Sequence, residues 1–189
     1  MSERFENPSL LFRIEDELLN NRLGGFVYKK HIAGLGLKGS EKILDFGSGS
    51  GAGSKHLAKL LAKGGGQLTC VDISSILVNK AKKRMRKYNN VDYKVGKLEE
   101  LDIPSNSHDA IYIFYVLHDV DKDLRQGIVK ELFRILKDDG KLYIGEPHKK
   151  NHGMPASEIR DLMKEAGFEE LQYNDLKSVY KAVFMKSNT

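Results

Sequence analysis

The sequence predicts an α/β protein built on a mostly parallel sheet of seven strands. Short apolar runs typical of strands alternate with amphipathic runs typical of helices, which indicates a parallel sheet covered on both faces. A glycine-rich segment, DFGSGSGAG, links the first strand to the helix that follows it. The last two strand-like runs, LQYNDL and VYKAVFMK, are too close together for a crossover helix. We therefore expect them to form an antiparallel hairpin.

Length and composition favour one globular domain over residues 1–189. The chain has 189 residues, of which 40% are hydrophobic, and this is enough to bury a core without disulfides or metals. The single cysteine, Cys70, excludes an internal disulfide and a cysteine-based zinc cluster. We expect a cytoplasmic protein, because a lone cysteine suits a reducing compartment and the N-terminus lacks the apolar core of a signal peptide. The longest apolar run, residues 111–117, is too short to cross a bilayer.

The elements follow in order along the chain. Residues 1–39 are expected to be helical. Asn7 is expected to cap a helix that ends at Gly24 and Gly25 and that carries Leu10 to Leu19 on its apolar face. Strands are expected at residues 42–46, 66–73, 91–95, 110–117, 141–146, 171–176 and 179–186. Helices are expected at residues 54–63, over the basic segment 76–87, at 121–140 and at 155–167.

The helix over residues 121–140 is predicted from apolar periodicity. Leu124, Ile128, Leu132 and Ile135 recur at helical spacing, and Gly140 is expected to end the helix.

Much of the positive charge behind the net charge of +5 lies in the basic segment 76–87. Its cations are Lys80, Lys82, Lys83, Arg84, Arg86 and Lys87. Such a cluster suits nucleic acid or an acidic membrane, but it also suits the solvated face of an amphipathic helix. We favour the solvated face, because no aromatic residue interleaves with the cluster before Tyr88 and no nucleic-acid motif accompanies it. On this interpretation Ile76, Leu77, Val78, Ala81 and Met85 face inward.

The glycine-rich segment has the features of a nucleoside-binding turn. Gly47, Gly49 and Gly51 let the backbone turn sharply and approach a ligand, and the helix that follows offers unpaired N–H groups. The second strand ends at Asp72, whose carboxylate suits a ribose diol. A dinucleotide remains an alternative here, because Gly47, Gly49 and Ala52 also satisfy the GxGxxA pattern.

Asp45, two residues before the first glycine, and the closing hairpin favour S-adenosylmethionine as the cofactor. The stretches ILDFGSGSG, VDIS, FRILKDDGKLYIGEP and EAGF, with the two closing strands, resemble the class I S-adenosylmethionine-dependent methyltransferases. Within them, the chain is most similar to the small type-11 and type-25 branch, which is related to the quinone-biosynthesis C-methyltransferases. The resemblance covers about residues 40–186. It implies one methyltransferase domain with a Rossmann-like core at residues 40–186 and residues 1–39 as a helical lid.

The resemblance also implies a set of cofactor contacts. Asp45 and the loop with Gly47, Ser48, Gly49 and Gly51 are expected against the methionine and ribose parts, and Asp72 on the ribose hydroxyls.

The remaining contacts come from neighbouring strand ends. Ile73 and Leu98 are expected to cover the adenine, Phe114 to approach the methionine part, and Tyr28 to touch the methionine carboxylate or pack at the rim. In many relatives an aspartate meets the adenine amine where this chain has Lys97. Lys97 cannot accept that hydrogen bond, and Glu99 and Asp102 are the candidates to replace the missing acid.

Tyr115 and His118 are the candidate catalytic residues, because they follow the fourth strand at the edge of the sheet where ligands bind. His118 is a candidate general base for an oxygen acceptor, and the alternative is that it orients the helix that follows. The donor is already activated, so positioning alone supplies most of the acceleration, and a base is needed only where the acceptor loses a proton. His148 and His152 are four residues apart in the segment 147–155 without a carboxylate, so we predict no metal site and a loop near the substrate.

We therefore predict methyl transfer from S-adenosylmethionine to a small-molecule acceptor. One alternative is an RNA or protein methyltransferase that uses the basic helix, although no added module for a long polymer is apparent. The others are an NAD(P)-dependent oxidoreductase and a non-catalytic protein that senses the cofactor.

Overall fold

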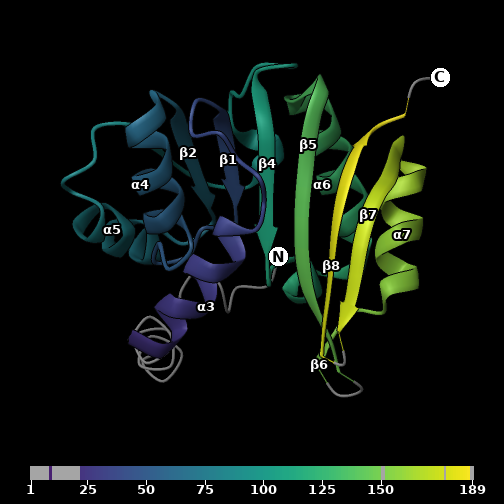
Figure 1. Ribbon diagram of the computed structural model, residues 1–189. Coiled ribbons are helices and arrows are strands. Elements are labelled where there is room, and N and C mark those ends of the chain that lie inside the picture. Colours follow the sequence, from purple (N-terminus) through teal and green to yellow (C-terminus); the bar gives the residue numbers. More distant parts are fainter. Residues whose placement is uncertain (1–8, 10–21, 150–151, 177, 188–189) are drawn as a thin grey trace. The chain divides into compact units, whose positions relative to one another are not determined.

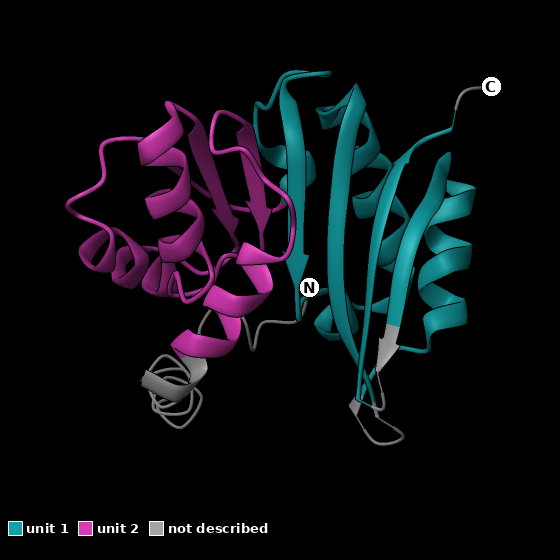
Figure 2. Ribbon diagram, in the orientation of Figure 1, with its two compact units in different colours: residues 1, 98–189 teal, residues 2–97 magenta. Residues whose placement is uncertain are grey.

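The structure is a computed structural model that describes residue 9 and residues 22–149, 152–176 and 178–187 (Figure 1). The chain divides into two compact units, an N-terminal unit of residues 2–97 and a C-terminal unit of residues 98–189 (Figure 2). The predicted helix that carries Leu10 to Leu19 lies outside the described residues.

The N-terminal unit contains a parallel sheet in the order β3-β2-β1. Its strands are β1 (Lys42–Phe46), β2 (Gln67–Asp72) and β3 (Val91–Val95), and its helices are α3 (Arg22–Ala33), α4 (Ser54–Gly64) and α5 (Ser75–Arg84). β1 pairs with β2 from Lys42 opposite Gln67 to Phe46 opposite Val71. Every residue of β1 after Lys42 is buried, as expected for a parallel strand covered on both faces.

The helices α4 and α5 place their apolar faces against this sheet. α4 buries Leu57 and Leu61 and is followed by the capping residue Gly65, which adopts the left-handed conformation (φ 82°) common at helix C-termini. Ser74 caps the start of α5, because its hydroxyl accepts a hydrogen bond from the Leu77 amide. Leu77, Val78, Ala81 and Met85 are buried as predicted, and Ile76 is half-buried.

The C-terminal unit contains a mixed sheet in the order β4-β5-β8-β7. Its strands are β4 (His108–Phe114), β5 (Leu136–Lys149), β6 (His152–Gly153), β7 (Phe168–Leu176) and β8 (Val179–Lys186), and its helices are α6 (Lys122–Ile135) and α7 (Ala156–Glu165). β4 and β5 are parallel, and β8 is antiparallel to both β5 and β7. The predicted closing hairpin is therefore confirmed. α6 and α7 contact each other and lie on the same side of this sheet (Figure 1).

The boundaries near residues 136–140 differ from the prediction. α6 ends at Ile135 rather than at Gly140, because Leu136 already pairs with His108 of β4 and opens the long strand β5. Leu124, expected on the apolar face of the helix, is 36% exposed, whereas Leu132 is fully buried.

Two further corrections concern strand ends. β4 stops at Phe114 instead of running to residue 117, because Tyr115 leaves the extended region with φ 62°. The segment 147–155, expected to be a loop, begins as the end of β5 and then forms β6, which pairs with β5. None of the described helices has the length and apolar character needed to cross a membrane.

Candidate functional site

The glycine-rich loop joins β1 to α4 and folds back on the end of β2. The amides of Gly47 and Ser48 both donate to the Val71 carbonyl, at 2.9 and 3.0 Å. Gly47, Gly49 and Gly51 all have positive φ, so a side chain at these positions would strain the backbone. A Cβ at Gly51 would lie 3.1 Å from the Met85 side chain, whereas a Cβ at Gly49 would meet nothing within 4 Å. The loop thus packs on α5 at Gly51 and borders open space at Gly49.

Asp72, at the end of β2, holds this loop. One carboxylate oxygen accepts a hydrogen bond from the Gly49 amide at 2.7 Å, and the other accepts from the Ser74 amide at 2.9 Å. These two bonds tie the glycine loop to the start of α5, and a carboxylate at this strand end is the kind of group that accepts hydrogen bonds from a ribose diol. Asp72 and its neighbour Ile73 are both half-buried. The glycine loop and Asp72, which the sequence placed in one site, are therefore brought together.

Asp45, the last residue but one of β1, is buried with 4% of its surface exposed. Its carboxyl accepts a hydrogen bond from the Ser54 hydroxyl at 2.5 Å. Burial, opposed by this hydrogen bond and reinforced by the negative charge of Asp72, raises the pKa of Asp45 to about 7. A cation near Asp45 would favour its charged form. Asp45 is therefore poised to change its ionisation when a positively charged ligand binds.

Arg84 holds the loop from its other side. Its guanidinium donates to the Ser50 carbonyl at 2.6 Å and to the Ser50 hydroxyl at 2.8 Å. Ser50 is buried, with 1% of its surface exposed. The basic segment 76–87 was interpreted as a solvated helix face, and this contact corrects that interpretation for Arg84. A local pattern could not have revealed it, because the two residues are 34 positions apart in the chain.

The other residues predicted to bind the cofactor are distributed over both units. Tyr28 is half-buried on α3, and Lys97 is exposed just after the Gly96 amide, which donates to the Asp72 carbonyl at 3.1 Å. Leu98 opens the C-terminal unit as the first residue of a short 3-10 helix, Leu98–Glu100, and is 2% exposed. Glu99 and Asp102, the candidates to replace the missing acid, are both exposed.

Phe114 lies at the end of β4 in the C-terminal unit and is 8% exposed. Its ring stacks on Tyr112 with the centroids 5.9 Å apart. A Cβ at Gly145 of β5 would lie 2.5 Å from two carbons of the Phe114 ring. Glycine at position 145 therefore allows the ring to lie across the neighbouring strand.

Tyr115 adopts a left-handed backbone conformation, with φ 62°, and is 37% exposed. A bulky residue in this conformation carries about 1–3 kcal/mol of strain, and such strain is concentrated at functional sites. Its amide donates to the Gly145 carbonyl at 2.8 Å. Burial and the negative charge of Glu146 raise the pKa of the Tyr115 hydroxyl.

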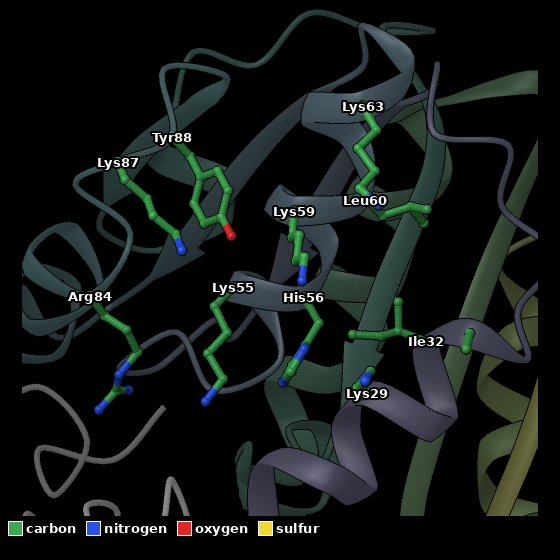
Figure 3. A pocket seen from close by; sticks show the side chains of 11 residues that line it. Lys29, Ile32, Lys55, His56, Lys59, Leu60, Lys63, Arg84, Lys87 and Tyr88 are labelled. Atoms are coloured by element: carbon green, nitrogen blue, oxygen red, sulfur yellow. The ribbon is translucent and has the colours of Figure 1, made fainter. Parts of the chain in front are cut away.

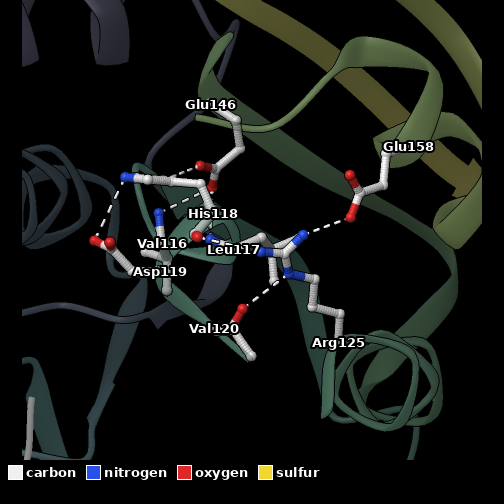
Figure 4. A network of polar contacts seen from close by, with 8 residues as sticks. All are labelled: Val116, Leu117, His118, Asp119, Val120, Arg125, Glu146 and Glu158. Carbon is white, nitrogen blue, oxygen red and sulfur yellow. Dashed lines mark hydrogen bonds and ion pairs between the residues drawn. The ribbon is translucent and has the colours of Figure 1, made fainter. Parts of the chain in front are cut away.

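A buried carboxylate, Glu146, organises the turn after Tyr115 (Figure 4). One of its oxygens accepts hydrogen bonds from the amides of Val116 and Leu117, at 2.9 and 2.8 Å. The other lies 2.6 Å from Nδ1 of His118, so this ring nitrogen donates to the carboxylate. Glu146 has no exposed side-chain surface, and the side chain of His118 is 5% exposed. The sequence analysis missed Glu146, although an acid at the end of an apolar strand run was a visible signal.

The same network sets the charge of His118. Burial alone would lower the pKa of His118, but the hydrogen bond to Glu146 and the charges of Glu146 and Asp119 outweigh it and raise the pKa. Nε2 of the ring lies 3.4 Å from an Asp119 carboxylate oxygen. Arg125 donates to the carbonyls of Val120 and His118 and forms an ion pair with Glu158 of α7 (Figure 4). His118 is thus both held in place and suited to accept and stabilise a proton.

His148 and His152 lie on β5 and β6, where His152 pairs with Lys149. In the part of the chain that the structure describes, no group of three or more histidine, cysteine, aspartate or glutamate residues is placed to hold a metal ion.

Comparison with known proteins agrees with this geometry. Residues 44–144 match the family model described as a methyltransferase domain. The chain is 30% identical over 112 residues to a demethylmenaquinone methyltransferase of Tropheryma whipplei, covering 59% of this chain and 44% of that protein. It is 26% identical over 150 residues to a ubiquinone/menaquinone biosynthesis C-methyltransferase of Vibrio cholerae, covering 77% of this chain and 56% of that protein. The chain thus spans about half the length of these relatives.

A solved structure confirms the fold. The crystal structure of an S-adenosylmethionine-dependent methyltransferase from Aquifex aeolicus superposes with a TM-score of 0.75 and 22% identity, covering 90% of this chain and 96% of that one. The predicted Rossmann-like architecture, mostly parallel with an antiparallel closing hairpin, is therefore correct. Because the family model covers more than half of its residues, this chain belongs to the methyltransferase-domain family, as its resemblance to the class I S-adenosylmethionine-dependent methyltransferases implied.

Proposed function

We propose that this protein transfers a methyl group from S-adenosylmethionine to a carbon of a small hydroxylated aromatic molecule of the quinol class. The observation that carries the cofactor assignment is the glycine loop held on Asp72, with open space beside Gly49. Family membership and the similarity to proteins named as quinone-biosynthesis methyltransferases support the reaction and the acceptor.

The residues present fit the cofactor. Asp72 places a carboxylate, which suits a ribose diol, beside the glycine loop, and Gly49 borders open space. Asp45 supplies a carboxyl whose charged form a nearby cation would stabilise. The bound cofactor brings a sulfonium, which is an activated methyl donor. Gly47, Ser48, Gly51, Ile73, Lys97, Leu98, Phe114 and Tyr28 complete the proposed contacts.

His118 and Tyr115 are the proposed catalytic residues. Removal of the proton from a ring hydroxyl increases electron density on the adjacent ring carbon. That carbon would form its bond to the methyl group as the sulfur–methyl bond breaks, with S-adenosylhomocysteine as the leaving group, and would then lose its own hydrogen as a proton to restore the aromatic ring. Nε2 of His118 would accept that proton, while Glu146 holds Nδ1–H and stabilises the positive ring. The raised pKa of His118 means that its ring holds an accepted proton more strongly than a free imidazole does. Tyr115, held at the same turn, would border the acceptor.

A cytoplasmic location is part of the proposal. It is supported by the single cysteine of the chain, Cys70, which is buried and not in a disulfide. Such cysteine usage suits a reducing compartment.

Thermal unfolding with four ligands tests the cofactor assignment. S-adenosylmethionine and S-adenosylhomocysteine should each raise the melting temperature, while NAD and NADP should not. A ligand at a hundred times its Kd adds about 2.7 kcal/mol, which is roughly 5–11 °C for a chain of this size. Asp72→Ala should weaken S-adenosylhomocysteine binding by about 1.5–3 kcal/mol. A shift with NAD alone would refute the methyltransferase proposal.

The acceptor is tested by incubating the enzyme and S-adenosylmethionine with reduced benzoquinones and naphthoquinones that lack the ring methyl group. Mass spectrometry should detect a product that has gained a methyl group on carbon. His118→Ala should lower turnover much more than it lowers S-adenosylhomocysteine affinity. If the variant turns over normally, His118 only orients the turn.

A further inference from the structure

A cationic pocket of about 470 Å³ lies on the outer side of α4, within the N-terminal unit (Figure 3). α3 and the end of α5 complete its walls. Its cations are Lys29, Lys55, Lys59, Lys63, Arg84 and Lys87. The volume is within the range of about 300–1,000 Å³ that is usual for small-molecule sites. The pocket is a feature of α4's solvent face, because the buried face of this helix carries Leu57 and Leu61 instead.

The charged side chains among the described residues that line this pocket are all cationic. None of the described residues that line it is acidic. Burial and the charge of Arg84 lower the pKa of Lys55. Burial and the charges of Lys55, Lys29 and Lys59 lower the pKa of His56, which also lines the pocket. The protein therefore brings several cations close enough to repel one another, and an anion in the pocket would relieve this repulsion.

The pocket also has an apolar part. Ile32 is 4% exposed, and Leu60 and Tyr88 are half-buried. These side chains reduce the water around the ammonium groups, which strengthens their attraction for an anion. A diffuse basic surface has no apolar part of this kind. The pocket therefore favours one compact ligand over a general attraction to polyanions.

We propose that this pocket binds a compact anion with at least two phosphate charges, and that its occupancy strengthens cofactor binding through Arg84. Phosphate chemistry is favoured because lysine and arginine together supply many donors and charges to a ligand with several oxygens. The second half of the proposal rests on the proposed function, since it requires the glycine loop to bind the cofactor.

Arg84 is the physical link between the two sites. It lines the pocket and donates to both the carbonyl and the hydroxyl of Ser50 in the loop. A negative charge in the pocket therefore acts on the same guanidinium that holds the loop. It fixes Arg84 on Ser50 and reduces the positive field that a cationic cofactor would meet. Both effects favour the loop conformation that binds the cofactor, and linkage makes the effect reciprocal.

Calorimetric titration of the full chain with inorganic pyrophosphate tests the pocket. We expect one site whose affinity falls about tenfold or more in Lys55→Gln/Lys59→Gln. The pair Lys83→Gln/Arg86→Gln removes the same charge from exposed positions outside the pocket. This control should change the affinity less than about twofold. The test variant should fold, because both lysines lie on the outer side of α4 and a cation in the first turn opposes the helix dipole.

Equal losses in the two variants would overturn the proposal, because they would indicate a general basic surface. The proposal would also be overturned if single-stranded RNA bound the unsubstituted protein more tightly than pyrophosphate does and if both variants weakened RNA binding equally. Vesicles of phosphatidic acid, whose phosphate monoester can carry two negative charges, distinguish a lipid headgroup from a free phosphate compound, and Phe26 and Val27 of α3, which are 66% and 54% exposed, make this comparison necessary. Vesicle binding that pyrophosphate displaces and Lys55→Gln/Lys59→Gln removes would assign the headgroup, and pyrophosphate binding alone would assign a free ligand.

The coupling is measured with S-adenosylhomocysteine in the presence and absence of saturating pyrophosphate. We expect its Kd to fall several-fold in the unsubstituted protein and to stay constant in Lys55→Gln/Lys59→Gln. An unchanged or increased Kd in the unsubstituted protein would overturn the coupling. If S-adenosylhomocysteine does not bind under any condition, the proposed function fails, while the pyrophosphate titration still decides the pocket.

Discussion

Asp45 offers a direct test of the electrostatics of the glycine loop. Its pKa is raised from 3.8 to about 7 in the folded protein, so the folded state binds a proton more readily than the unfolded chain. Stability that depends on this group is present below pH 3.8 and is lost as the pH rises through about 7. The shift of about three pKa units corresponds to about 4 kcal/mol, of which roughly 2 kcal/mol is lost between about pH 5 and pH 7.

Asp45→Asn removes this titration but keeps an oxygen that accepts the hydrogen bond from Ser54. We expect the free energy of unfolding of the variant to vary less with pH than that of the unsubstituted protein. Above about pH 7 the variant should be the more stable of the two, by up to about 4 kcal/mol, reduced by about 1 kcal/mol or more where the new amide lacks a partner. Below about pH 4 this advantage should disappear.

Urea unfolding followed by circular dichroism, repeated in half-unit steps from about pH 5 to pH 8, measures both curves. The difference between the two proteins isolates Asp45, because every other titrating group is shared. Parallel curves would refute the reasoning, since they would mean that Asp45 stays ionised in the folded protein. A difference that grows with increasing pH would confirm it.

Substitutions at three further positions test the turn after β4. Glu146→Gln should lower the pKa of His118, which NMR titration measures, and should cost about 1–3 kcal/mol of stability. The variant should also lose less stability as the pH rises through the His118 pKa. An unchanged His118 pKa would contradict the network. Gly145→Ala should displace the Phe114 ring, costing about 1–3 kcal/mol by thermal unfolding and weakening S-adenosylhomocysteine binding, and unaltered stability would contradict the close contact. Tyr115→Gly and Tyr115→Ala both remove the ring and should both lower turnover, but only glycine relieves the backbone strain, so Tyr115→Gly should be the more stable of the two by about 1 kcal/mol, and equal stabilities would contradict the strain argument.

The order of strands and helices was predictable because its signals are local. The apolar run of β1, the buried positions of α5 and the short gap before the closing hairpin all lie within a few residues of one another. The boundary at Leu136 was not predictable in this way. Two acids and Gly140 are typical of a helix end, but pairing of Leu136 with His108 extends β5 through this segment. A contact between distant residues overrides the local preference there.

In the candidate site, too, local features were predictable and contacts between distant residues were not. The glycine loop and Asp72 follow a spacing that the sequence displays, and the structure joins them by a hydrogen bond. An acid at the end of the apolar run of β5 is visible in the sequence, but the role of Glu146 was not predictable, because its partners Val116 and His118 precede it by 30 and 28 residues. The cationic pocket likewise combines a local pattern with a contact between distant residues. Lys55 and Lys59 share a helix face by their spacing, but only the fold adds Arg84 to them.

The dependence of the turn on Glu146 has a consequence for cooperativity. The amides of Val116 and Leu117 are satisfied by a side chain of β5 rather than by the turn itself. The turn therefore has little independent stability, and it becomes ordered only when β5 has formed beside β4. In native-state hydrogen exchange these two amides should exchange with the sheet as one unit, not with the exposed loops. Any partial opening that frees the end of β5 would therefore disrupt the arrangement of the proposed catalytic residues, Tyr115 and His118, while most of the sheet remains intact.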